Sequence, residues 1–219
     1  KVLLSGRTEA SLEVAVNQLG PLAKCVVVDN ASSAAGKQLT KTCQHHFDRL
    51  DGALISVGGP PRGSVMETTD QAWRSSFETV FLGAIRIARE VASQLQPGGS
   101  IIFVLSSSVK VPLEQMAISN GLRAGLGMVA KTLADELGPL GIRVNALLPG
   151  RLETDRIRFL ENATGDAEAA RSQALSQIPL GRYGEPAEFG RAAAFLLSPA
   201  ASYLTGVSLP VDGGMLKSL

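Results

Sequence analysis

The sequence has few cysteines and almost no excess charge. Cys25 and Cys43 are the two cysteines among its 219 residues, and they lack Cys-x-x-Cys spacing. Neither a disulfide framework nor a metal site is therefore expected. The formal net charge is +1, and lysine and arginine do not cluster, which argues against a nucleic-acid partner and against an anionic membrane surface. The expected partner is a small molecule.

Long hydrophobic runs are also absent. The apolar segments are too short to span a bilayer, and no signal peptide is recognisable at the start of the sequence. Cysteines without a disulfide pattern fit a reducing compartment, so the expected location is the cytoplasm. The sequence has no repeat, low-complexity tract or linker-like stretch. We therefore expect a single domain over residues 1–219.

Short runs rich in valine and isoleucine alternate with longer segments of helical period along the whole chain. The expected strands span residues 1–5, 24–29, 52–57, 100–105, 143–148 and 206–211. Alternation of this kind predicts a parallel sheet with helices on both faces. The strands are nearly continuous in apolar residues, as burial on both faces requires. The predicted fold is α/β, with a doubly wound, Rossmann-like parallel sheet.

The residues directly after the expected strands are candidate binding residues, because ligands of doubly wound sheets bind outside the carboxyl ends of the strands. Glycine and small polar residues dominate these positions, as expected where backbone approaches a ligand closely. The positions are Ser5, Gly6, Arg7, Asp29, Asn30, Gly58, Gly59, Pro60, Pro61, Ser106, Ser107, Ser108, Pro149, Gly150, Asp212, Gly213 and Gly214.

Residues 119–127, SNGLRAGLG, allow two interpretations. Their G-x-x-x-G-x-G spacing suits a phosphate-binding loop, but such a loop leaves a strand directly, whereas this stretch follows a polar connection. Apolar residues recur at helical spacing through and beyond it, at Leu122, Leu126, Val129, Leu133 and Leu137. The helical interpretation is favoured. Its glycines would then allow close packing against a neighbouring helix or subunit, and Ser119 and Arg123 would share one helix face.

Several segments together resemble the short-chain dehydrogenase/reductase family, especially 3-oxoacyl-acyl-carrier-protein reductases. Residues 141–155, GIRVNALLPGRLETD, are similar to the family's strand followed by Pro-Gly-x-x-x-Thr, and residues 178–214 are similar to its closing segment. Residues 47–63 and 68–90 are similar to its fourth strand and the long helix that follows. The resemblance implies an NAD(P)-dependent oxidoreductase acting on a carbonyl or hydroxyl group, a homodimer or homotetramer, and a substrate-covering lid between Arg156 and Gln177. It also implies cofactor contacts from Pro149, Gly150 and Thr154.

The family usually opens with a strand and a Thr-Gly-x-x-x-Gly-x-Gly turn that binds the cofactor pyrophosphate, and residues 1–219 contain no such unit. In the doubly wound order this strand is central, so without it the strands on either side would be unpaired in the middle of the sheet. We expect an upstream strand–turn–helix unit in the native protein. Residues 1–219 alone are not expected to fold stably.

The resemblance also places residues at the four catalytic positions of the family. Ser106 matches the serine, while Ser119 stands at the tyrosine, Arg123 at the lysine and Val80 at the asparagine. A serine hydroxyl does not release its proton near neutral pH without a strong base, and arginine does not deprotonate in proteins. Arg123 is expected to hold the nicotinamide ribose. Lys110 is either a substitute acid or a solvated loop lysine.

The residues at the end of the first expected strand indicate which cofactor, NAD or NADP, is preferred. An acidic residue there would bind the ribose hydroxyls of NAD, whereas an arginine accommodates the 2′-phosphate of NADP. The sequence offers Ser5 and Arg7, with no acid before Glu9, so NADP is favoured over NAD unless Arg7 merely caps a surface turn. By resemblance, Asp29 contacts the adenine and Gly58 is the glycine after the fourth strand.

Two functions remain open on the sequence. One is an NADP-linked oxidoreductase in which Ser106 polarises a substrate carbonyl and the proton comes from water, Lys110 or the substrate. The other is a catalytically silent member of the same fold that binds a nucleotide or a partner subunit. The second follows from the replacement of three catalytic positions in an otherwise intact scaffold.

Overall fold

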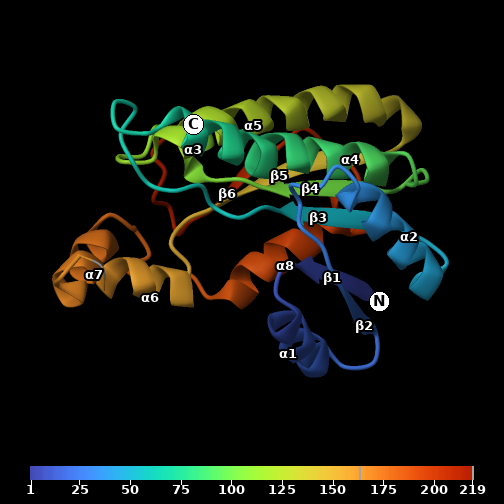
Figure 1. The fold of residues 1–219 in the computed structure, drawn as a ribbon, viewed down its shortest axis with the longest axis horizontal. Coiled ribbons are helices and arrows are strands. Elements are labelled where there is room, and N and C mark those ends of the chain that lie inside the picture. Colours follow the sequence, from blue (N-terminus) through green and yellow to red (C-terminus); the bar gives the residue numbers. More distant parts are fainter. Residues whose placement is uncertain (163, 219) are drawn as a thin grey trace.

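The computed structural model describes residues 1–162 and 164–218, except for the side chain of Arg156. Six parallel strands lie close to the expected bounds (Figure 1). They are β1 (Val2–Gly6), β2 (Ala23–Val27), β3 (Gly52–Ser56), β4 (Ser100–Val104), β5 (Arg143–Pro149) and β6 (Ser208–Val211). The predicted Rossmann-like α/β domain is confirmed.

Helices connect successive strands and cover the sheet (Figure 1). The α-helices are α1 (Glu9–Leu19), α2 (Ala35–Phe47), α3 (Asp70–Ser76), α4 (Gly83–Ala92), α5 (Ala117–Leu137), α6 (Asp155–Asn162), α7 (Ala167–Ser176) and α8 (Pro186–Leu197). Between α3 and α4 the backbone forms a π-helix, η1 (Phe77–Leu82), and short 3-10 helices are η2 (Ser107–Val109), η3 (Gly138–Leu140) and η4 (Pro199–Ala201). In the described part of the chain, no helix is both long and apolar enough to cross a membrane.

The hydrophobic core lies on both faces of β4 and β5. Successive side chains of a strand point to opposite faces, so each strand contributes to the core on both sides. Ile101 and Phe103 belong to the cluster under α4 and α5, whereas Ile102, between them, packs with Leu196 of α8. All three strand residues are at most 1% exposed. Burial of each such side chain stabilises the fold by about 1.5–3 kcal/mol, so these two strands are the most heavily stabilised part of the sheet.

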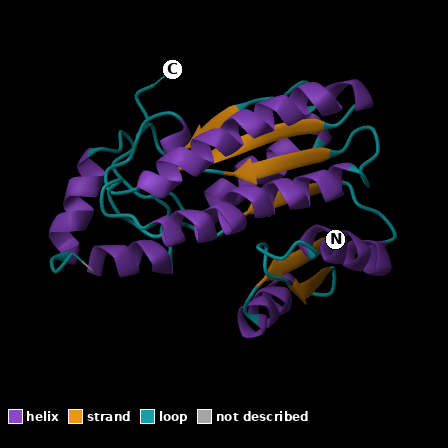
Figure 2. Cartoon of the chain, turned by 45° about the horizontal axis from the view of Figure 1, so that its top comes forward, coloured by secondary structure: helices purple, strands orange, loops and turns teal. Residues whose placement is uncertain are grey.

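The sheet is divided between β1 and β3. Strands β1 and β2 pair with each other, while β3, β4, β5 and β6 form a separate four-stranded sheet (Figure 2). Val2 of β1 and Leu54 of β3, in the strands beside the division, are 40% and 43% exposed, unlike the buried residues of β4 and β5. This is the arrangement that a missing central strand would produce, and the upstream unit itself stays a prediction.

Residues 119–127 lie inside α5, so the helical interpretation is confirmed and the phosphate-loop interpretation is excluded. A Cβ on Gly121 would lie 3.4 Å from the ring of Trp73, and one on Gly125 would lie 2.9 Å from Phe81. A Cβ on Gly127 would lie 2.8 Å from a side-chain carbon of Val109. The three glycines therefore allow close packing within the chain, and they give no support of their own to the expected homo-oligomer.

Arg143, at the start of β5, is a buried cation whose partners are backbone carbonyls. Its guanidinium donates to oxygens at the end of α8 and in the segment that follows. The acceptors are Leu196 O at 2.7 Å, Ser198 O at 3.1 Å, and Leu197 O and Leu204 O at 3.4 Å. The last carbonyls of a helix have no partner within the helix, so Arg143 fixes the end of α8 against β5.

Candidate functional site

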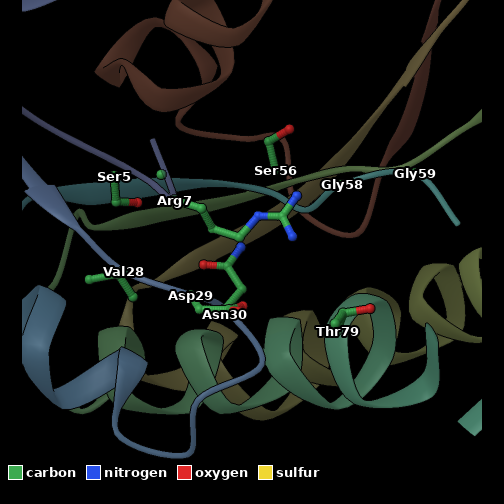
Figure 3. A pocket seen from close by; sticks show the side chains of 10 residues that line it. Ser5, Arg7, Val28, Asp29, Asn30, Ser56, Gly58, Gly59 and Thr79 are labelled. Carbon is green, nitrogen blue, oxygen red and sulfur yellow. The ribbon is translucent and has the colours of Figure 1, made fainter. Parts of the chain in front are cut away.

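A cavity of about 230 Å³ opens at the carboxyl ends of β1, β2 and β3 (Figure 3). This is the edge where a doubly wound sheet binds its ligands. The lining residues are Ser5, Gly6, Arg7, Val28, Asp29, Asn30, Ser56, Gly58, Gly59 and Thr79. The structure thus brings together five residues that were expected to bind a cofactor, from three separate strand ends.

The end of β1 contributes a cation and a hydroxyl to this cavity. Arg7 is exposed, and its side chain extends across the middle of the cavity, between the β3 end and the loop at Asn30 (Figure 3). Asp29 is the one carboxylate among the lining residues, and its Oδ1 accepts a hydrogen bond of 2.9 Å from the N–H of Ala31. Because the Arg7 guanidinium is exposed in the cavity, it can donate charge-assisted hydrogen bonds to an anionic group.

The loop that carries Asp29 and Asn30 rests directly on α4. A Cβ on Gly83 would lie only 2.4 Å from the carbonyl oxygen of Asn30, so this close approach requires glycine. Arg86, one turn further along α4, donates to Ala31 O at 3.4 Å and pairs with Glu78 at 3.0 Å. The first turn of α4 therefore fixes one wall of the cavity.

Nothing in the sequence pattern indicated that Val28 and Thr79 line the cavity. Thr79 lies in the π-helix η1, where its hydroxyl donates to Ser75 O at 3.0 Å. Single turns of π-helix occur frequently at functional sites, but the sequence around Thr79 has an ordinary helical pattern. The adjacent Val80, which we expect at the position of the family asparagine, is only 2% exposed.

Ser106 follows β4 and is half-buried. Its Oγ accepts a hydrogen bond of 3.1 Å from the N–H of Ser108, so Ser106 caps the start of η2. Accepting this bond leaves the Ser106 O–H group able to donate. Lys110, directly after η2, is exposed.

Ser119 is enclosed, with 1% of its surface exposed. Its Oγ lies 3.3 Å from the Oγ of Ser108, and Ser108 Oγ also donates to Ser119 O at 3.4 Å. The residue that we expect at the family's tyrosine position therefore faces another serine inside the protein, and it is not among the residues that line the cavity. A catalytic role for Ser119 remains untested.

Arg123 is 7% exposed, and its guanidinium donates to four backbone carbonyls. The Nη1 group bonds to Val104 O and Leu105 O, both at 3.0 Å, and the Nη2 group bonds to Val57 O at 3.3 Å and Gly58 O at 3.4 Å. Arg123 thereby joins the ends of β3 and β4. The expected contact with a nicotinamide ribose remains a prediction.

Pro149, Gly150 and Thr154 lie at and beyond the carboxyl end of β5, outside the lining of the described cavity. A Cβ on Gly150 would lie 2.6 Å from Cα of Asp212, so the two segments touch through their backbones. Thr154 Oγ1 accepts a hydrogen bond of 3.4 Å from Ile157 N in the first turn of α6. These residues therefore join the expected lid to the sheet.

Most of the expected lid, residues 156–177, consists of α6 and α7, and residue 163 within it lies outside the described residues. Arg171 bonds to Glu153 at 2.5 Å, which lowers the pKa of that carboxyl, and stacks over the ring of Tyr183 at 4.5 Å. Burial and the hydrogen bond to Glu161 raise the pKa of Tyr183. The phenol therefore stays protonated at neutral pH as a structural donor.

Comparison with known proteins extends over almost the whole chain. The family model described as enoyl-(acyl carrier protein) reductase matches residues 1–216. L-rhamnose 1-dehydrogenase (NAD(P)+) of Azotobacter vinelandii is 33% identical over 218 residues, which cover 98% of this chain and 84% of the relative. The 3-oxoacyl-(acyl-carrier-protein) reductase of Escherichia coli is 29% identical over 217 residues, which cover 98% of this chain and 86% of the relative.

A solved structure has the same fold. It is the NADPH-bound form of a short chain oxidoreductase from Pseudomonas aeruginosa, described as containing an atypical catalytic center. The two chains superpose with a TM-score of 0.91 at 27% sequence identity, over 99% of this chain and 87% of that one. Together with the family match and the relatives, this similarity shows that the chain belongs to the short-chain dehydrogenase/reductase family.

Proposed function

We propose that the protein is an NADP-linked oxidoreductase that acts on a carbonyl or hydroxyl group, similar to the group reduced by 3-oxoacyl reductases. The observation that carries this proposal is Arg7, which lies in the cavity directly after β1, where no carboxylate precedes Glu9. The NADPH in the Pseudomonas aeruginosa structure and the reductase activity of the Escherichia coli relative support it.

The lining residues suit the adenosine half of such a cofactor. A cavity of about 230 Å³ is smaller than the ~300–1,000 Å³ typical of small-molecule sites, so it suits part of a dinucleotide. We assign the 2′-phosphate to Ser5 and Arg7, the adenine to Asp29 and Asn30, and a close backbone approach to Gly58. The bound cofactor would supply or accept a hydride.

The nicotinamide half is assigned to Pro149, Gly150 and Thr154 at the end of β5. We also propose that an upstream strand pairs between β1 and β3, because both strands have an unpaired edge there and exposed apolar residues beside it. The turn after such a strand would reach the same edge of the sheet as the cavity. It would bring backbone N–H groups to the pyrophosphate.

Replacing Arg7 with alanine in the full-length protein is expected to weaken NADPH binding about tenfold and to leave NADH binding unchanged. The variant loses a charge-assisted bond to the 2′-phosphate, which NADH lacks. Fluorescence titration with both nucleotides measures this difference. Arg49→Ala is the matched control, since Arg49 is exposed and paired with Asp51 away from the cavity, and it should change neither affinity. An equal loss for both nucleotides would contradict the assignment.

The activation of the substrate carbonyl is assigned to Ser106. Its O–H group would donate to a substrate carbonyl and polarise it, while water, Lys110 or the substrate supplies the proton. The hydroxyl of Ser119 faces the hydroxyl of Ser108, which is not a strong base. Arg123 keeps its proton at all ordinary pH values.

The Ser106→Ala variant is expected to reduce turnover about tenfold, which corresponds to the loss of one neutral hydrogen bond to the reacting carbonyl. NADPH affinity should stay unchanged, because the serine is assigned to the substrate. Steady-state kinetics on a reducible carbonyl substrate and a parallel titration check both points. Unchanged turnover would remove Ser106 from the mechanism.

A catalytically silent nucleotide-binding or partner-binding protein is the second candidate. It is favoured by the enclosure of Ser119 and by the backbone bonds of Arg123, both at positions where the family has proton-transfer groups. NADPH binding without turnover of any carbonyl substrate would favour this alternative. Binding of neither nucleotide would contradict the oxidoreductase proposal.

A further inference from the structure

The guanidinium of Arg123 lies where the pairing of β3 with β4 stops. The last residue pair of the β3–β4 ladder is Ser56 with Val104, where the regular pairing of the two strands ends. Arg123 bonds to carbonyls on both sides of this point, at 3.0–3.4 Å. One side chain of α5 therefore continues the connection between the two strands after their own hydrogen bonds end.

Each of the two strand ends carries part of the proposed site. Gly58, whose carbonyl accepts from Arg123, lines the cavity. Leu105, whose carbonyl accepts on the other side, directly precedes Ser106. A single guanidinium group therefore links the turn that carries Ser106 to the cavity wall at Gly58.

Arginine suits this task better than lysine. The guanidinium is planar and presents its donors in a fixed fork, whereas a lysine ammonium is a single point of charge on a flexible stem. Two carbonyls from each strand match two amino groups of the fork. A lysine ammonium at this position has three donors on one nitrogen, so it cannot satisfy the same four acceptors.

We propose that Arg123 is a positioning residue, which holds the Gly58 wall of the cofactor cavity and the Ser106 turn at a fixed separation. It acts through the backbone and does not touch the reacting atoms. The inference rests on the proposed function for its effect on NADPH and turnover. Its structural part, the restraint of the two strand ends, stands on the four hydrogen bonds alone.

Arg143 provides a matched control. It too is a buried arginine with four backbone carbonyl acceptors, but these lie at the end of α8 and in the segment after it. None of its acceptors lines the cavity. Arg123→Lys and Arg143→Lys therefore make the same chemical change in two places, one beside the proposed site and one remote from it.

The test compares these two variants with the wild-type full-length protein by NADPH titration and by amide hydrogen exchange. Arg123→Lys is expected to weaken NADPH binding about tenfold and to speed exchange in residues 57–59 and 105–109. Arg143→Lys is expected to leave NADPH affinity unchanged and to speed exchange at the end of α8. Melting temperatures of both variants separate these local effects from a general loss of stability.

The positioning role is overturned if Arg123→Lys leaves exchange in both segments unchanged, or if the two variants lose NADPH affinity equally. Failure of the wild-type protein to bind NADPH would contradict the proposed function instead. In that case the exchange data still decide whether Arg123 restrains the two strand ends.

Discussion

Replacing Arg143 with methionine is expected to lower the free energy of unfolding by about 2–3 kcal/mol. Methionine fills a similar length and adds no buried charge, but it has no donor for the carbonyls at the end of α8. Hydrogen bonds to a charged group contribute about 1.5–3 kcal/mol, and a buried acceptor left without a partner adds its desolvation cost. At roughly 2–4 °C per kcal/mol for a chain of this size, the melting temperature should fall by about 4–12 °C.

The expected loss of unfolding free energy in Arg143→Met stays in this range because three of the four carbonyls that accept from Arg143 have a second donor. Those donors are Ser100 Oγ to Leu196 O, Ala201 N to Ser198 O, and Asn145 Nδ2 to Leu204 O. The carbonyl of Leu197 depends on Arg143 more directly, at 3.4 Å. The variant should therefore fold, with a weakened contact between α8 and β5.

Urea or thermal unfolding of the full-length protein measures the effect. Arg89→Met is the control, because Arg89 is exposed on α4 and methionine is a good helix former. Its expected change is within about 0.5 kcal/mol. If Arg143→Met changed stability no more than this control, the buried guanidinium would have no net stabilising role.

The regular part of the fold was predictable because it depends on local pattern. The sequences of β4 and β5 are nearly continuous in apolar residues, which predicts a strand buried on both faces. The structure buries both strands in this way. The cavity was predictable for a topological reason, since the carboxyl ends of parallel strands meet at one edge. Ser5, Asp29 and Gly58 lie at this edge although long segments separate them in the sequence.

The partners of buried arginines were not predictable from local pattern. Arg123 bonds to carbonyls 18–19 residues before it and to others 65–66 residues before it, and backbone carbonyls carry no signature in a sequence. Ser119 was placed correctly in a helix, but its enclosure by Ser108 depends on how η2 packs against that helix. Thr79 reaches the cavity from a π-helix, and this local widening has no pattern of its own.

Replacing Gly83 with alanine is the second change with a large expected effect, and its sign is opposite to the one that helix propensity predicts. Alanine normally stabilises a helix interior by about 1 kcal/mol relative to glycine. At Gly83 the added Cβ would lie 2.4 Å from Asn30 O and 3.0 Å from Glu78 O, so backbone has to shift. Overpacking of this kind costs about 1–3 kcal/mol, which exceeds the gain in helix propensity, and we expect a net destabilisation of up to about 2 kcal/mol.

Gly190→Ala separates steric overlap from helix propensity. Gly190 lies within α8, and a Cβ there would meet no described atom within 4 Å. This variant should raise the melting temperature slightly, whereas Gly83→Ala should lower it. Because Asn30 lines the cavity, Gly83→Ala should also weaken NADPH binding, while Gly190→Ala should leave it unchanged. If both alanines stabilised the protein, the close approach of the Asn30 loop to α4 would be wrong, and with it the cavity wall that this loop forms.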